Sequence, residues 1–217
     1  GATVTFLASH THYAPSLDPG KPLLGATDAR HLGHAAGIVA DLICDVATRS
    51  PMKVTQLNSG NALAAHTINR RKLRFATFGH TTNGFRKVVL SPAPEGPRDE
   101  TLTTLLIIAN NSPVAAIWNF ACHPVSLPDR GRQSAHYVGE VRERIREWCQ
   151  RPDLPVLFAQ GVSGDIGPSH PSTLRPGNTG LRRLRIGPSF SDFTESGYRQ
   201  WTSSLADRVI QGLNSSS

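Results

Sequence analysis

The sequence predicts an α/β fold in which a layered mixed sheet is flanked by helices, and three observations support this class. Short apolar segments rich in β-branched residues alternate with longer segments of helical periodicity, and turn residues separate them. The chain has 217 residues, 38% of them hydrophobic, which is enough for one core. No segment approaches the ~20 apolar residues that a membrane-spanning helix needs. We expect a single domain over residues 1–217, incomplete at one or both ends because the chain opens inside an apolar segment without an initiator methionine.

The first predicted elements are a buried strand and a long helix. ATVTFLA, residues 2–8, is apolar and β-branched, and the Tyr-Ala-Pro-Ser sequence soon after it indicates a loop. Residues 27–49 place apolar side chains at helical spacing, with Thr27 or Asp28 as the N-cap. We expect this helix to pack on the core. MKVTQLNSG, residues 52–60, then indicates a short strand that runs into a loop.

The middle of the chain predicts a strand pair, a helix and a further strand. TLTTLLIIAN and VAAIWNFAC, residues 101–110 and 114–122, are joined by the turn sequence Asn-Asn-Ser-Pro. Residues 134–150 carry one apolar stripe opposite an Arg/Glu face, which is typical of a helix on the surface of a core. PVLFAQ, residues 155–160, is a short apolar segment and indicates another buried strand.

A long loop and a last helix complete the predicted architecture. Residues 161–191 are rich in Gly, Pro and Arg, and loops of this length are more often functional than simple connectors. The basic part from Arg175 to Arg185 is expected to face an anionic headgroup or an anionic membrane surface, with a solvated loop as an equal alternative. The last helix is expected over residues 192–213.

Charge and cysteine content argue against other classes of protein. The formal net charge is +7, yet arginine alternates with glutamate in the second helix and no nucleic-acid motif accompanies it, so we expect no nucleic-acid partner. Cys44, Cys122 and Cys149 are an odd number without close spacing, which argues against a disulfide framework and a Cys-x-x-Cys zinc site. Cys44 and Cys149 are expected to be buried in helices.

Histidines stand where predicted strands end. Alternate residues of an extended chain share a side, so His10 and His12 are expected to point together, and His123 ends another strand. Open α/β sheets hold ligands at the carboxyl ends of strands, and imidazole is the commonest transition-metal ligand. The sequence therefore predicts a zinc site at this edge, with an open position for water or substrate if the site is catalytic. His31 and His34 are a second candidate pair, for which we favour a capping or surface role.

Four segments, in order, resemble the neutral/alkaline, non-lysosomal ceramidase family. SHTHYAPS resembles the family's Ala-Thr-His-Thr-His-Ser-Gly-Pro segment, and HTINRR resembles its Asn-Arg segment. NFACHPVSL is similar to the family's strand that ends in His-Pro or His-Gly, and GDIGPS is similar to its Gly-Asp-Val-Ser-Pro-Asn hexapeptide. The resemblance covers about Phe6 to Ser169 and, more weakly, the last helix, and its specific signal is the joint order of the segments.

The resemblance implies a zinc-dependent hydrolase that cleaves the N-acyl amide bond of ceramide or a related lipid amide. In such enzymes zinc polarises the carbonyl and activates the attacking group, while a nearby histidine moves a proton or donates to the oxyanion. The residues that the resemblance implies are His10 and His123 for zinc, His12 and Asp165 for catalysis, and Asn69 and Arg70 for substrate binding.

Two departures from the family pattern shape these expectations. Gly167 stands where the family has its serine nucleophile, so we expect a metal-activated water to attack, because Ser163 or Ser169 would substitute only in a rebuilt loop. The family takes its remaining zinc ligands, a glutamate and a tyrosine, from a downstream region. Either a missing segment supplies them, or His12, Asp165 or another group completes the set. The alternative function is a non-catalytic ceramidase-like binding or interaction module.

Overall fold

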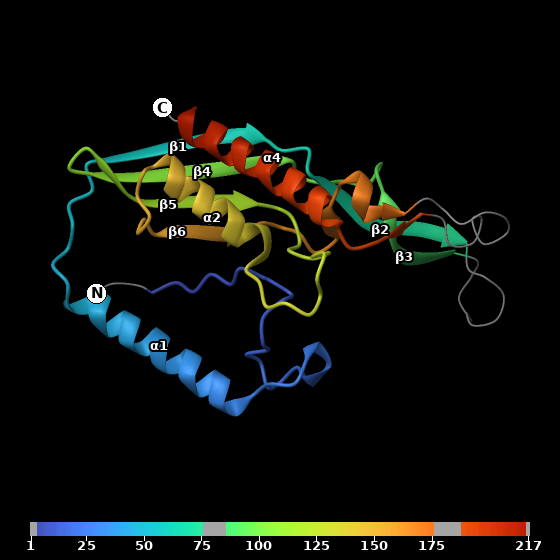
Figure 1. Ribbon diagram of the computed structural model, residues 1–217, viewed down its shortest axis with the longest axis horizontal. Helices are drawn as coiled ribbons and strands as arrows, with labels where there is room; N and C mark the ends of the chain where they lie inside the picture. The colour runs from blue at the N-terminus through green and yellow to red at the C-terminus, as the bar shows by residue number, and fades with distance from the viewer. Residues whose placement is uncertain (1–3, 76–85, 176–187, 216–217) are drawn as a thin grey trace.

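A four-stranded mixed sheet forms the centre of the computed structural model, which describes residues 4–75, 86–175 and 188–215. The strands lie in the order β1, β4, β5, β6 (Figure 1). Neighbours pair antiparallel except β5 and β6, which run parallel. Their bounds are Gln56–Leu63 for β1, Thr101–Ala109 for β4, Ser112–Phe120 for β5 and Val156–Gln160 for β6. The expected mixed α/β class is confirmed.

Helices α2 (His136–Trp148) and α4 (Glu195–Asn214) cover one face of this sheet (Figure 1). Along β4, Leu102, Thr104 and Leu106 are buried while the residues between them are exposed or half-buried, as expected for a strand with one covered face. The two helices and the strand face beneath them share one hydrophobic core, whose largest fully buried side chains include Trp118, Tyr137 and Leu205.

Local signals identified the β4–β5 hairpin and helix α2 correctly. The hairpin turns at Asn110 and Asn111, which have left-handed φ angles of 52° and 59°, a conformation that asparagine tolerates better than most residues. Helix α2 begins at His136, and its apolar stripe packs on the core through buried Val141 and Ile145. The strand predicted within residues 155–160 is β6, and the last predicted helix is α4.

A second, three-stranded sheet in the order β3, β2, β7 extends from the end of the first (Figure 1). Its strands are β2 (Thr67–Phe75), β3 (Arg86–Ala93) and the short β7 (Ile166–Pro168). The loop predicted over residues 161–191 therefore contains β7, and also a turn of 3-10 helix, η2 (Pro171–Thr173), and the pair β8 (Leu174–Arg175) and β9 (Ser189–Phe190). Most of the basic stretch from Arg175 to Arg185 lies outside the described residues.

The predicted N-terminal strand is wrong. Residues 4–21 form no strand, and Val4, Phe6 and Leu7 are 54%, 68% and 51% exposed. A short 3-10 turn, η1 (Pro22–Leu24), follows. The apolar pattern identified residues that favour burial, but none of the described strands pairs with them. His10 and His12 are therefore not delivered by the end of a strand, which corrects the expected position of the metal site.

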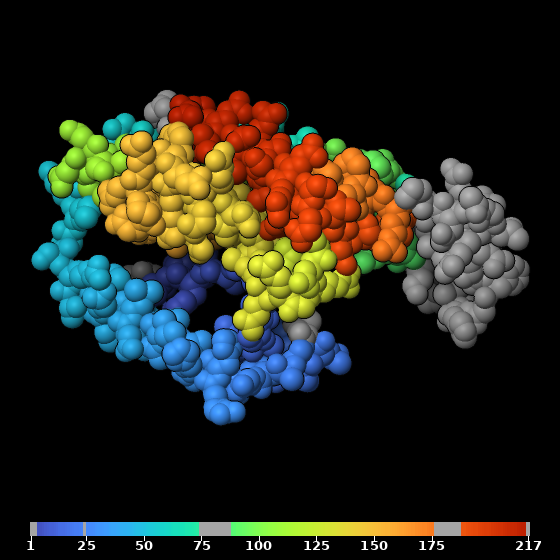
Figure 2. Space-filling view, viewed as in Figure 1, coloured from blue at the N-terminus to red at the C-terminus, as the bar shows by residue number. Residues whose placement is uncertain are grey.

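Helix α1 (Ala29–Thr48) forms where the sequence predicted a helix, but it does not pack on the core. Its N-cap is Asp28, whose carboxylate accepts hydrogen bonds from the backbone N–H groups of Arg30 and His31. None of its residues is buried, and Figure 2 shows open space between α1 and the sheet body. Cys44 is consequently exposed rather than buried, while Cys149 is half-buried.

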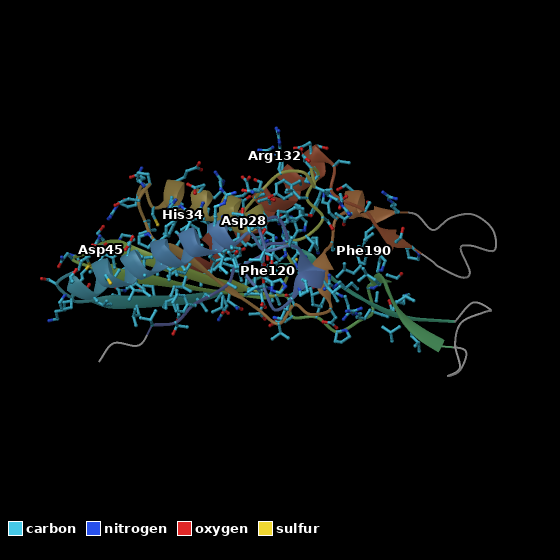
Figure 3. All side chains as sticks on the ribbon, turned by 90° about the horizontal axis from the view of Figure 1, so that it is seen from below. Asp28, His34, Asp45, Phe120, Arg132 and Phe190 are labelled. Atoms are coloured by element: carbon cyan, nitrogen blue, oxygen red, sulfur yellow. The ribbon has the colours of Figure 1, made fainter. Side chains whose placement is uncertain are left out.

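The histidines of α1 lie along an exposed helix. Asp28 and Asp45 lie near its two ends, with His34 between them (Figure 3).

No helix in the described part of the chain combines the length and the apolar character required to cross a bilayer.

Candidate metal centre

Three histidines from distant parts of the chain lie together. The candidate ligand nitrogens of His10, His12 and His123 are all within 4.8 Å of one another. The ring centroids of His10 and His123 are 4.8 Å apart, and the His12 ring lies 5.4 Å from the first and 5.5 Å from the second. Three imidazoles with an open fourth position are one of the ligand sets of catalytic zinc. The donor set therefore fits a transition metal ion, and no other residue among those described belongs to this group.

The segment that carries His10 and His12 is shaped by hydrogen bonds to a loop rather than by a sheet. His10 has a left-handed φ of 59°, which bends the backbone there. The Thr11 hydroxyl donates to the Ser134 carbonyl at 2.8 Å, and the Ser134 N–H donates back to the Tyr13 carbonyl at 2.9 Å. This pair of bonds holds the segment against the loop that precedes α2.

His123 follows β5 by three residues and is 5% exposed. Its Nδ1 lies 2.5 Å from the Ser163 carbonyl oxygen and 3.2 Å from that of Ile166. A nitrogen between two carbonyls must carry the proton, so Nε2 keeps the lone pair. Metal-binding histidines are commonly oriented by this kind of N–H to carbonyl bond.

The electrostatic surroundings favour the neutral forms of His123 and His12. Burial and then the Arg70 guanidinium lower the pKa of His123 to about 4. Burial, followed by His10 and Arg70, also lowers the pKa of His12. A neutral imidazole has a lone pair for a cation or a proton, whereas a protonated one has none.

Strand β2 brings Asn69 and Arg70 beside the turn between β6 and β7. The Asn69 side chain is 2% exposed, and its amide group donates to the Asp165 carboxylate at 2.8 Å and to the Pro97 carbonyl at 2.9 Å. The backbone N–H of Arg70 donates to the Asp165 carbonyl at 2.7 Å. The structure thus joins Asn69, Arg70 and Asp165 in one network, although the Asp165 carboxylate is outside the three-histidine group.

Arg70 connects this network to the histidines. Its Nη2 lies 3.1 Å from Nε2 of His123 and donates to the Gly164 carbonyl at 3.0 Å. Because Nε2 of His123 holds the lone pair, the guanidinium donates to it. The nitrogen that a metal would use is therefore also the acceptor of a charged hydrogen bond.

A pocket of about 590 Å³ opens beside the cluster, with His12, Arg70 and Gly167 on its wall. Leu90, Val125 and Phe190 add apolar surface to it. A Cβ atom on Gly167 would meet only Cδ of Arg70, at 4.0 Å, and its φ is not left-handed. Packing therefore leaves room for a side chain at position 167, where the ceramidase family resembled by this sequence has a serine.

Sequence reasoning missed the supporting residues Tyr13, Ser163 and His136. Ser163 acts through its main-chain carbonyl, which no side-chain pattern reveals. Tyr13 directly follows His12, but nothing local shows that its ring stacks on His136, with centroids 5.6 Å apart and planes 11° from parallel.

Fold and site together define a mixed α/β domain with a candidate metal centre beside a pocket. Among the solved structures that share this fold are two ceramidase structures. The crystal structure of neutral ceramidase from Pseudomonas aeruginosa matches with a TM-score of 0.57 and 16% identity, over 95% of this chain and 29% of that chain. A ceramidase complexed with C2 matches with a TM-score of 0.59 and 16% identity, over 96% and 30%.

The resemblance to neutral ceramidase expected from the sequence is therefore confirmed for the fold. The chain spans less than a third of the length of these structures. Comparison with protein-family models gives no match, and comparison with curated protein sequences gives none either.

Proposed function

We propose that this chain carries part of the catalytic site of a zinc-dependent hydrolase that cleaves an N-acyl amide, with ceramide or a related lipid amide as the substrate class. The observation that carries the proposal is the group of three imidazoles, with ligand nitrogens within 4.8 Å, at the wall of a pocket. The ceramidase fold supports the same reaction class.

In this proposal His10 and His123 hold the metal, and the donor chemistry favours zinc because imidazole suits it well. Zinc, when bound, polarises a carbonyl oxygen and lowers the pKa of water. The carbonyls of Ser163 and Ile166 orient His123 so that its lone pair is available. His12 completes the ligand set or remains beside it, and a further protein segment that supplies a carboxylate or a phenol is the other way to complete it.

The remaining residues have roles in proton transfer and substrate binding. Where a further segment completes the ligand set, His12, whose pKa is lowered by burial, keeps its lone pair and accepts the proton of the attacking water. Arg70 and the apolar side chains of Leu90 and Phe190 face the substrate in the pocket. Asp165 is the second catalytic residue of this proposal, and Asn69 contributes to the substrate site by holding its carboxylate. Since Gly167 offers no nucleophile, water is the attacking group.

Two partner expectations belong to the same proposal. An anionic membrane surface is the proposed source of the lipid amide, and its proposed contact is the basic stretch from Arg175 to Arg185, most of which lies outside the described residues. Nucleic acid has no part in this function.

Metal content and hydrolysis test the proposal together. The purified chain is expected to bind one zinc ion and to release fatty acid from an N-acyl amide, and His10→Ala and His123→Ala are each expected to abolish both. His34→Ala, which removes an exposed histidine of α1, is the matched control and should change neither. A folded chain that binds no zinc would refute a hydrolase whose metal site this chain completes by itself and would favour the non-catalytic binding module.

A further inference from the structure

Tyr13 is the residue of the N-terminal segment that packs against the main hydrophobic core. Its phenolic oxygen accepts a hydrogen bond from the Leu127 N–H at 2.7 Å, and its carbonyl accepts one from the Ser134 N–H at 2.9 Å. The residues on either side of the histidine pair have little comparable support, since Phe6 and Leu17 are 68% and 53% exposed. The position of His12 therefore depends on its two neighbours: Thr11, through its bond to Ser134, and Tyr13, which is the one that packs a ring against the core.

The surface that receives the Tyr13 ring is fixed by the body of the fold. His136 is 1% exposed and begins helix α2 with a left-handed φ of 54°. Its ring stacks on Tyr13 and also contacts Tyr137 and Tyr198 edge-on, at 5.3 Å in each case. A ring packed on several sides has one orientation, and so gives Tyr13 a rigid platform.

We propose that Tyr13, stacked on His136 and hydrogen-bonded to Leu127 and Ser134, is the positioning residue that holds His10 and His12 within reach of His123. The chemical purpose of this arrangement rests on the proposed function, but the positioning itself does not. The segment has no strand to fix it, so the anchor must be local. Tyr13 supplies it one residue from His12 and three residues from His10.

A set of substitutions separates the two side-chain components of the anchor, whereas the acceptor for the Ser134 N–H is the main-chain carbonyl of Tyr13 and is lost only if the segment moves away. Tyr13→Ala removes both the ring and the acceptor, whereas Tyr13→Phe keeps the stack and loses only the acceptor for Leu127. His136→Phe keeps a flat ring under Tyr13. Tyr198→Phe is the matched control, because it removes a phenolic oxygen from another ring that contacts His136 but lies on α4.

The first measurement needs no metal. In the metal-free wild-type chain, nuclear Overhauser contacts are expected between the ring protons of His10 and His123, and the amides of Leu127 and Ser134 should exchange slowly. Tyr13→Ala should lose the ring contacts and expose both amides, Tyr13→Phe should expose mainly Leu127, and the His136→Phe and Tyr198→Phe variants should keep the contacts. Ring contacts that survive in Tyr13→Ala would overturn the proposal.

The second measurement is the affinity for zinc, determined by competition with a chromogenic chelator. Tyr13→Ala is expected to weaken binding by roughly tenfold or more, as loss of an outer support of a metal ligand does, while thermal unfolding of the sheet body changes little. Rescue by Tyr13→Phe would distinguish positioning from loss of the fold. If the wild-type chain binds no zinc, the proposed function fails, and the ring contacts and amide exchange still decide whether Tyr13 positions the histidines.

Discussion

Nη2 of Arg70 lies 3.1 Å from Nε2 of His123, so a permanent cation donates to the nitrogen that would bind a metal. The contact is possible because two carbonyl oxygens hold the Nδ1 proton of His123 on the other side of the ring. Metal and guanidinium then compete for one lone pair. The metal site and the substrate pocket, both of which Arg70 reaches, are linked through this contact.

Removal of the Arg70 side chain is expected to strengthen zinc binding. Arg70→Ala should raise the affinity by about tenfold, because a hydrogen bond to a charged group is worth ~1.5 kcal/mol and the variant frees Nε2 of His123 from it. Hydrolysis should nevertheless fall, since the substrate contact is lost. Arg71→Ala, which removes the neighbouring exposed arginine, serves as the control in the same titration. Weaker zinc binding in Arg70→Ala would contradict the competition.

A serine at position 167 should be accepted by the fold. Because a Cβ there meets only Arg70 at an ordinary contact distance, Gly167→Ser should change the free energy of unfolding by less than ~1 kcal/mol. If the pocket still places a hydroxyl at position 167 against the scissile carbonyl, Gly167→Ser should hydrolyse N-acyl amides faster than Gly167→Ala, which has similar bulk without the hydroxyl. Equal rates in the two variants would show that a hydroxyl at this position does not reach the substrate.

His66 is expected to make stability depend on pH. Burial lowers its pKa from 6.5 to about 4, and its ring packs edge-on against Trp201. Since the folded-state pKa is the lower one, the stabilisation is complete above pH 6.5 and is lost as the pH falls towards 4. The loss should be on the order of 2 kcal/mol, and His66→Phe should reduce it in urea titrations at pH 7 and pH 4. An unchanged pH slope in that variant would argue against this assignment.

The two long helices should differ in their contribution to stability. Leu205 in α4 is fully buried, so Leu205→Ala should cost ~2–5 kcal/mol. Leu42 in α1 is 59% exposed, so Leu42→Ala should cost no more than ~0.5 kcal/mol. Denaturant unfolding of the two variants compares them directly, and a large loss in Leu42→Ala would mean that α1 packs in solution.

The sequence predicted best those elements whose signals are local. The hairpin turn at Asn110 and Asn111 and the amphipathic stripe of α2 each lie within a few residues of one another, so no distant partner was needed. Strands β2 and β3 went unassigned because the charged run NRRKLR hides the alternation in β2. The apolar patterns of residues 2–8 and of α1 predicted burial, yet the described residues of both segments are exposed or half-buried, because a local pattern cannot say which surface will cover it.

At the candidate site too, the sequence revealed the local features and missed the contacts between distant residues. The sequence indicated that His10, His12 and His123 belong together, and the structure places their rings side by side, but through a bent loop instead of a strand end. The stack of Tyr13 on His136 joins positions more than a hundred residues apart, and such a contact has no local signature. Three-dimensional packing alone reveals it.

The pair of carbonyl oxygens around Nδ1 of His123 also limits how protons can move through the centre. The Nδ1 proton of His123 is held by the carbonyls of Ser163 and Ile166 and is not free to exchange with a substrate. His123 is therefore unsuited to proton transfer. In the proposed reaction proton transfer then falls to His12, and if His12 stands beside the ligand set instead of in it, replacing this imidazole should leave a centre that still binds its ion but hydrolyses slowly.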